Sequence, residues 1–168
     1  MINGINSREM ILEILLEIED GEHSHVAIRN ALSKYQFLPK QDRAFITRVC
    51  EGTLEYRIQI DYIINSFSKV TVDKMKPAIR EILRSAVYQL KYMDSVPDSA
   101  VCNEAVKLAQ RKGFYNLKPF VNGVLRTIAR EMNQVEFPKK EDDLLKYLSV
   151  KYSMPETLVT RWLDAYGE

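Results

Sequence analysis

The stretch that decides the fold is Phe120-Val-Asn-Gly-Val-Leu-Arg126, which runs on to Arg130. Taken alone, an Asn-Gly pair is typical of a tight β-hairpin turn. The neighbouring residues argue against a turn, because the apolar ones recur at helical spacing. These apolar residues are Phe120, Val121, Val124, Leu125 and Ile128. The pattern therefore predicts that the Asn-Gly pair lies inside an amphipathic helix.

The Asn122-Gly123 pair is unfavourable in a helix, which suggests that it has a compensating role. A glycine in a helix interior costs roughly 1 kcal/mol relative to alanine, and asparagine is also a poor helix former. Without a Cβ, Gly123 would let another helix backbone approach closely, while Asn122 would bind a neighbouring backbone. We interpret this stretch as the central packing helix, with Arg126 and Arg130 on its flank. A Gly123→Leu change is accordingly expected to force packed helices apart.

Helical spacing of apolar residues extends over most of the chain. It predicts five helices ahead of the one capped at Asn116: from Asn6 or Ser7 to Asp20, from a cap at Ser24 to Tyr35, from about Lys40 to Ser68, from a cap at Asp73 to Leu90, and from a cap at Asp98 or Ser99 to Gly113. A kink or a tight helix crossing is expected at Gly52. No segment alternates convincingly as a strand would. The sequence therefore predicts an all-α fold with about six core helices.

A short extension is expected after this bundle. Pro138 and the polar run 139–143 are typical of a linker, and two short helical patterns follow, over Leu144–Val150 and Glu156–Tyr166. We therefore divide the chain into a helical domain, residues 1–137, and a linker with a helical connector, residues 138–168.

The composition excludes several classes of protein. No apolar run approaches the ~20 residues that span a bilayer, and the N-terminus lacks the layout of a signal peptide. The two cysteines, Cys50 and Cys102, form no disulfide framework and fit a reducing compartment. We expect a cytoplasmic protein without membrane contact.

Charge is unevenly distributed along the chain, although the formal net charge is only +1. Residues 1–25 carry six acids against Arg8 alone: Glu9, Glu13, Glu17, Glu19, Asp20 and Glu22. Residues 107–140 carry eight bases against Glu131 and Glu136: Lys107, Arg111, Lys112, Lys118, Arg126, Arg130, Lys139 and Lys140. The second segment is a candidate surface for an anionic partner such as RNA.

The residues that catalysis or metal binding would need are missing from the pattern. The six glycines are never close enough to form a phosphate-binding loop, and the cysteines have no ligands at metal spacing. The only two histidines, His23 and His25, lie in an expected turn. We therefore predict no catalytic residue and no metal site in this chain.

Two motifs together resemble the NusB fold family. They are Val96-Pro-Asp-Ser-Ala-Val-Cys-Asn-Glu-Ala-Val-Lys-Leu-Ala109 and Phe120-Val-Asn-Gly-Val-Leu-Arg126. That family includes antitermination factors and the N-terminal domain of RsmB-type (Sun/Fmu) rRNA cytosine-5 methyltransferases. Further segments resemble the methyltransferase branch: Asp42-Arg43-Ala44, Gly52-Thr-Leu54, Ile60-Asp-Tyr-Ile-Ile64, the ending at Arg126 with Arg130 after it, Leu148-Ser-Val-Lys-Tyr-Ser-Met-Pro155, Leu158-Val159 and Arg161-Trp162.

The resemblance implies a helical domain that binds rRNA in front of a covalently linked methyltransferase domain. Such enzymes use S-adenosylmethionine and a cysteine in a Pro-Cys dipeptide. Neither Cys50 nor Cys102 follows a proline, and the glycine-rich cofactor loop is absent. We therefore expect a fragment that binds no cofactor itself, whose parent protein carries the S-adenosylmethionine and the catalysis.

Individual residues receive candidate roles on this basis. The candidate RNA contacts are Lys112, Lys118, Arg126, Arg130, Arg43 and Arg8. Mainly structural roles are expected for Asp61, Glu104, Asn122 and Gly123, which match family motif positions. Glu104 is expected near the positive end of a helix dipole, and Arg43 is expected to pair with an acid across helices.

Two other functions remain open at this stage. A NusB-type transcription antitermination factor, which binds RNA and a ribosomal protein, would use an arginine-rich start of the first helix. Here that helix offers only Arg8 among six acids. A helical protein-interaction module without any RNA role would fit the near-neutral net charge.

Overall fold

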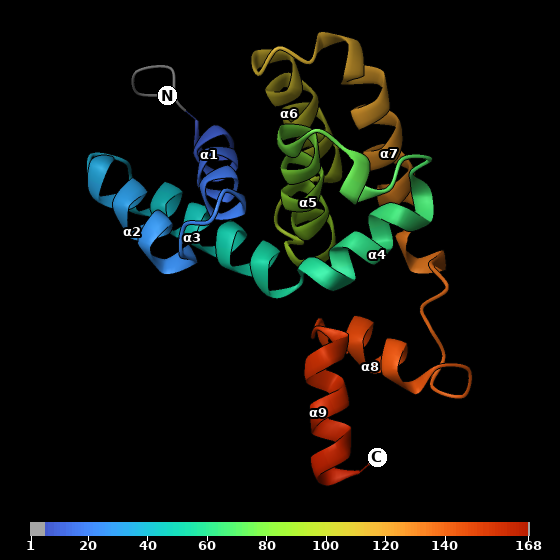
Figure 1. The fold of residues 1–168 in the computed structure, drawn as a ribbon. Helices are drawn as coiled ribbons and strands as arrows, with labels where there is room; N and C mark the ends of the chain where they lie inside the picture. The colour runs from blue at the N-terminus through green and yellow to red at the C-terminus, as the bar shows by residue number, and fades with distance from the viewer. Residues whose placement is uncertain (1–5, 168) are drawn as a thin grey trace.

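The computed structural model describes residues 6–167, which form an all-helical bundle with a helical extension (Figure 1). The helices are α1 (Ser7–Glu19), α2 (Ser24–Lys34), α3 (Lys40–Glu55), α4 (Arg57–Phe67), α5 (Pro77–Tyr92), α6 (Asp98–Arg111), α7 (Lys118–Glu131), α8 (Leu144–Tyr152) and α9 (Glu156–Tyr166). Short 3-10 turns lie at Val72–Lys74, Tyr115–Leu117 and Met132–Gln134. The all-α prediction is confirmed, since no strand occurs within residues 6–167. None of the described helices is long and apolar enough to cross a membrane.

The helix starts follow local capping rules only in part. Asn6 caps α1 as predicted, because its Oδ1 accepts a hydrogen bond from the Glu9 N–H at 2.8 Å. Helices α2, α5, α6 and α7 begin without a side-chain cap, so the caps predicted for them were wrong. Those predicted caps were Ser24, Asp73, Asp98 or Ser99, and Asn116. In α5 the first residue is Pro77, which needs no N–H partner and whose φ is already helical.

The long helical pattern from Lys40 to Ser68 forms two helices that meet at Tyr56. The Tyr56 ring stacks on Tyr92 of α5, with ring centroids 4.5 Å apart. The tight crossing expected at Gly52 is confirmed, because a Cβ there would overlap the Tyr88 ring. Gly52 therefore lets α3 lie directly against a tyrosine of α5.

The central helix of the bundle is α5, which corrects the central position predicted for α7. Helix α5 packs against α1, α3, α4, α6 and α7, whereas α7 packs at the edge against α4, α5 and α6. Every residue from Glu81 to Leu90 is buried. A helix that is covered on all sides belongs to the middle of a bundle.

Gly123 does not mediate a close helix approach, so that prediction was wrong. It is exposed, and a Cβ built on it would have no neighbour within 4 Å among residues 6–167. The predicted backbone contact of Asn122 is also absent, since its Oδ1 instead accepts a hydrogen bond from the Arg126 Nε at 3.2 Å. The Asn-Gly pair thus lies on an open face of α7.

A buried ionic network joins α4 to α5. Arg84 donates hydrogen bonds to the Asp61 carboxylate at 2.7 and 2.8 Å, and to Glu81 at 2.7 Å. Burial raises the pKa of the Glu81 carboxyl, an effect that the adjacent Arg84 only partly opposes. Asp61 thus lies at a helix–helix contact.

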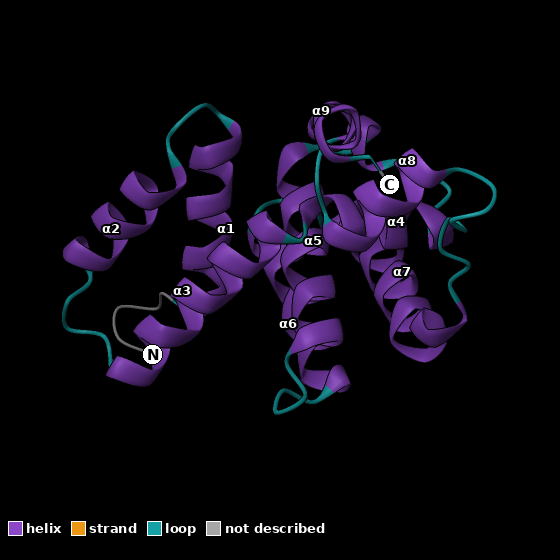
Figure 2. Cartoon of the chain, turned by 90° about the horizontal axis from the view of Figure 1, so that it is seen from below, coloured by secondary structure: helices purple, strands orange, loops and turns teal. Residues whose placement is uncertain are grey.

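The C-terminal extension is attached to the bundle through α8, which packs on α4. At the linker, the Tyr62 hydroxyl donates to the Glu136 carbonyl at 2.7 Å, and the Tyr62 ring stacks on Phe137. Helix α9 packs against α8 and reaches away from the bundle (Figures 1 and 2). The boundary at residues 137 and 138 remains a prediction.

Candidate nucleic-acid interface

A polar stripe runs along one face of α7. Lys118, Asn122, Arg126 and Arg130 follow one another at steps of four, which places them on the same side of a helix. Arg126 joins this stripe to α6, because its guanidinium donates to Asn103 Oδ1 at 2.7 Å as well as to Asn122. The structure therefore brings three of the candidate RNA contacts into one row.

The two ends of this row are accessible. The Lys118 ammonium lies 4.5 Å from the centroid of the Tyr115 ring, and Tyr115 is 64% exposed. The Arg130 side chain is 68% exposed and lies 3.9 Å from the neighbouring Glu131 carboxylate. Lys118 is half-buried, and a base beside an exposed aromatic ring is suited to a phosphate and a nucleobase.

Lys112 is separated from this row and is paired with the acidic helix α1. Its Nζ lies 3.4 Å from carboxylate oxygens of both Glu9 and Glu13. The adjacent Arg111 lies 3.9 Å from Glu9. The acidic start and the base-rich segment thus partly neutralise each other, so the surplus of bases between 107 and 140 overstates the free positive surface.

Arg8 is held against the bundle. Its Nε donates to Gln89 Oε1 at 3.2 Å, and its guanidinium carbon lies 5.2 Å from the centroid of the Phe45 ring. Burial lowers the pKa of Arg8, and the charge of Glu104 acts in the opposite direction. In a NusB-type antitermination factor, the Arg8 guanidinium would be expected to bind RNA. In this structure, contacts within the protein already occupy part of it.

Arg43 and Glu104 do not have the neighbours expected for them. Among residues 6–167 no acid pairs with Arg43, and its buried Nε has no hydrogen-bond partner. Glu104 lies in the middle of α6, beyond the first turn that the helix dipole affects, and approaches Lys107 at 3.5 Å. The expected acid partner of Arg43 and the dipole role of Glu104 were therefore wrong.

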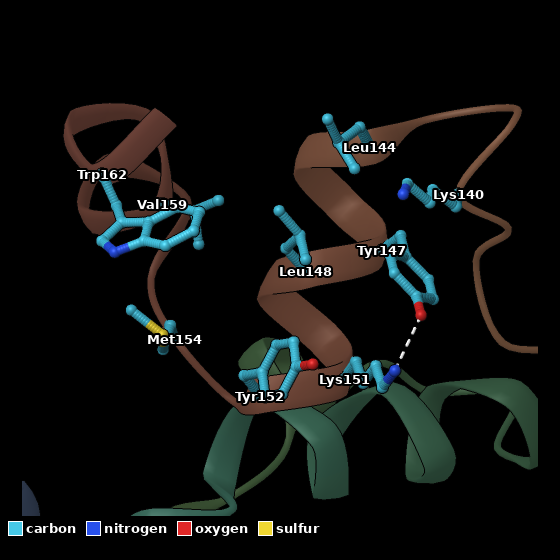
Figure 3. A pocket seen from close by; sticks show the side chains of 9 residues that line it. All are labelled: Lys140, Leu144, Tyr147, Leu148, Lys151, Tyr152, Met154, Val159 and Trp162. Carbon is cyan, nitrogen blue, oxygen red and sulfur yellow. Dashed lines mark hydrogen bonds between the residues drawn. The ribbon is translucent and has the colours of Figure 1, made fainter. Parts of the chain in front are cut away.

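A cavity of about 450 Å³ lies between α8 and α9 (Figure 3). Its lining is mainly apolar or aromatic: Leu144, Tyr147, Leu148, Tyr152, Met154, Val159 and Trp162, with Lys140 and Lys151. The Lys151 ammonium donates to the Tyr147 hydroxyl at 2.8 Å. Sequence analysis missed this cavity, although the aromatic and leucine content of 144–166 would have signalled an apolar face.

Within residues 6–167, no group of three His, Cys, Asp or Glu side chains is arranged to hold a metal ion. The His23 and His25 rings stack on each other, with centroids 6.1 Å apart.

Residues 5–130, which run from α1 into α7, match the NusB family, and the chain belongs to that family. The extension formed by α8 and α9 lies outside the match.

Two relatives represent the two branches that this chain resembles. The probable ribosomal RNA small subunit methyltransferase B of Bacillus subtilis is 36% identical over 160 residues, which is 95% of this chain and 35% of the relative. The transcription antitermination protein NusB of Dictyoglomus thermophilum is 33% identical over 134 residues, which is 79% of this chain and 88% of the relative. The chain spans about a third of the length of the methyltransferase relatives that it matches.

Solved structures share the fold. A complex of the antitermination factors NusB and NusE with double-stranded RNA contains a chain that superposes with a TM-score of 0.68 at 21% identity, covering 74% of this chain and 93% of that one. The structure of PH0851 superposes with a TM-score of 0.74 at 21% identity, covering 98% of this chain but 37% of that one. A longer protein thus shares the extension as well as the bundle.

Proposed function

We propose that this chain is an RNA-binding domain that positions small-subunit rRNA for a covalently linked, S-adenosylmethionine-dependent cytosine-5 methyltransferase domain in the cytoplasm. The observation that carries the proposal is the pattern of coverage. The NusB relative leaves about a fifth of this chain unmatched while using most of its own length. The methyltransferase relative matches nearly the whole chain and extends far beyond it. The extension formed by α8 and α9 is therefore a feature that this chain shares with the longer methyltransferase relative.

The α7 stripe supports the RNA-binding part of this proposal. Lys118, Arg126 and Arg130 offer positive charge on one face, and phosphate contacts of this kind position a nucleic acid without reading its sequence. The NusB in the solved complex binds double-stranded RNA together with NusE. We extend RNA binding to this chain as part of the proposal, with modest and sequence-tolerant affinity because the linked domain would do the chemistry.

The extension supports the linkage. Helix α9 buries only Val159, while Trp162 and Tyr166 are 48% and 77% exposed. The two rings are neighbours, with centroids 5.8 Å apart, and neighbouring exposed apolar groups are suited to contact with another protein unit. S-adenosylmethionine and the catalytic cysteine would belong to that linked unit, and this chain alone would bind no cofactor.

The test is RNA binding by charge-reversal variants. The three reversals Lys118→Glu, Arg126→Glu and Arg130→Glu together should weaken binding to small-subunit rRNA fragments. The slope of log affinity against log salt should fall by about 0.7–0.9 for each lost phosphate contact. Thermal melting must first show that the variant folds, since Arg126 links α6 to α7. Unchanged affinity of a folded variant would rule out the α7 stripe.

Calorimetric titration with S-adenosylmethionine should give no heat of binding.

The second candidate is a NusB-type antitermination factor that binds RNA and a ribosomal protein. It is favoured by the match to the Dictyoglomus NusB over most of that protein's length. Arg8→Glu separates the two functions, because the antitermination reading places the RNA contact at the start of α1. Loss of RNA binding in Arg8→Glu, with no effect of the α7 reversals, would select the second candidate. If the wild type binds no RNA at any salt concentration, the remaining candidate is a protein-interaction module.

A further inference from the structure

A second base-rich surface of the bundle lies on α2 and α3, away from the α7 stripe. Residues 24–50 carry five Lys or Arg side chains and a single acid, Asp42. The five bases are Arg29, Lys34, Lys40, Arg43 and Arg48. Within residues 6–167 none of these five forms a salt bridge, whereas Lys107, Arg111, Lys112 and Arg130 of the other base-rich segment all do.

Three of these bases line an open groove of about 490 Å³. Lys40, Arg43 and Arg48 lie along α3, and Leu32 of α2 forms part of the wall. Of the described residues, Glu51 is the one acid in the lining of the groove. A groove with three bases and one acid attracts an anionic ligand, and bases at a spacing of three to five residues along a helix suit an extended one.

The arginines in the groove keep hydrogen-bonding capacity. Within the described part of the chain, Arg48 makes one hydrogen bond, from its Nη2 to the Tyr92 carbonyl at 3.0 Å. Arg43 has a buried Nε without an acceptor among the described residues. A guanidinium carries five N–H donors, and a phosphate is the acceptor that matches it in geometry and charge. A phosphate in the groove would therefore accept hydrogen bonds from the terminal Nη groups of these arginines rather than from the buried Nε of Arg43.

An aromatic residue stands at the tip of this helical hairpin. Phe37, in the loop between α2 and α3, is 49% exposed and meets the edge of the Tyr35 ring, with centroids 5.8 Å apart. The Lys34 ammonium lies 5.4 Å from the centroid of the same Tyr35 ring. Phe37 precedes Lys40, the first base of the groove, by three residues in the chain. Bases together with an exposed aromatic ring are the combination by which proteins hold single-stranded nucleic acid.

We propose that the α2–α3 groove binds the sugar–phosphate backbone of RNA through Lys40, Arg43 and Arg48, and that Phe37 stacks on an unpaired base beside it. This inference rests on the proposed RNA-binding function and adds a second contact surface to it. Helix α5 separates α3 from α7, so the two surfaces engage different parts of an RNA (Figure 1). RNA rather than an acidic protein is the chosen ligand because the exposed ring accompanies the charge.

The test compares two triple variants with the same change in net charge. The groove variant carries Lys40→Glu, Arg43→Glu and Arg48→Glu. The control carries Lys69→Glu, Lys74→Glu and Lys76→Glu, three exposed lysines between α4 and α5. Binding of a fluorescent small-subunit rRNA hairpin with a single-stranded loop is measured by anisotropy over a series of salt concentrations. Circular dichroism checks folding, and if the groove variant does not fold, Lys40→Glu with Arg48→Glu replaces it and is compared with Lys69→Glu and Lys74→Glu.

The groove variant should lose affinity, and its salt slope should fall by about 2 to 3, while the control keeps the wild-type slope. Phe37→Ala should weaken binding to the looped hairpin and leave a fully paired duplex unaffected. Equal losses in both triple variants would show that only bulk charge matters and would overturn the inference. If the α7 reversals weaken RNA binding and the groove variant does not, the groove is rejected as an RNA contact. The proposed function would then still stand.

Two further outcomes concern the ligand itself. Failure of the wild type to bind RNA would reject the proposed function and this inference together. A polyglutamate peptide that binds the wild type more tightly than the hairpin, and loses affinity in the groove variant, would assign the groove to an acidic protein instead.

Discussion

Ser153 of the C-terminal extension caps helix α4 at Ile58. The Ser153 Oγ accepts hydrogen bonds from the backbone N–H groups of Ile58 and Gln59, at 3.2 and 3.4 Å. Helix α4 has no side-chain cap from its own preceding residue, Tyr56. Because the first N–H groups of a helix have no partners within it, the extension completes a helix of the bundle.

Ser153→Ala should therefore lower the free energy of unfolding by about 1 kcal/mol, the usual effect of losing a cap. Ser153 has a φ of 52°, a left-handed conformation that glycine adopts without strain. Ser153→Gly is the matched comparison: it also removes the hydroxyl but should lose less stability than the alanine variant. Urea denaturation measures both, and a wild-type midpoint for Ser153→Ala would refute the capping role.

The two helix-interior glycines should respond in opposite directions to alanine. Gly52→Ala should lower the free energy of unfolding by about 1–3 kcal/mol, because its Cβ would overlap the Tyr88 ring. Gly123→Ala should raise it by up to about 1 kcal/mol, because alanine is the better helix former and the space is open. Thermal melting of the pair tests both predictions. If Gly123→Ala is less stable than the wild type, another helix backbone must approach Gly123 closely, as the sequence predicted.

Replacing the acids that hold Lys112 should strengthen RNA binding. The double variant Glu9→Gln and Glu13→Gln releases Lys112, which could then contact a phosphate and steepen the salt slope by about 0.7–0.9. The control is Glu17→Gln with Glu22→Gln, which changes the net charge equally on and just after the same helix, where no salt bridge is lost. Equal gains in both variants would show that Lys112 makes no phosphate contact of its own.

Because of Glu81, the free energy of unfolding should decrease as pH rises above the ordinary range of carboxyl pKa values. Burial raises the pKa of Glu81 above its ordinary value of 4.5, so in this window the folded state holds a proton that the unfolded state has lost. Stability is then highest below the unfolded pKa and decreases as pH rises through the folded pKa. Glu81→Gln cannot titrate, so the wild type should lose stability relative to it over this window. Chemical denaturation at a series of pH values tests this, with the exposed Glu141→Gln as control; parallel curves for the wild type and Glu81→Gln would contradict it.

The positions of the helices followed from sequence to within a few residues, because helical periodicity is a local property. The apolar spacing around Asn122-Gly123 predicted a helix against the turn preference of that pair, and α7 contains it. Motifs such as Val96–Ala109 supported the family for the same reason, since they are contiguous in the chain. The buried Arg84 network and the cavity between α8 and α9 went unpredicted, because each joins separate helices.

What the sequence by itself determined is the all-α class, the approximate helix ranges, the cap at Asn6, the tight crossing at Gly52 and the NusB-type motifs. Only the tertiary structure decided that α5 is the central helix and that Lys112 is paired with Glu9 and Glu13. It also decided that the bases of α2 and α3 form no salt bridge among residues 6–167. The physical reason is that a charge is neutralised by its neighbours in space. Which acid lies beside a given lysine depends on how the helices pack, whereas the period of a helix is written in consecutive residues.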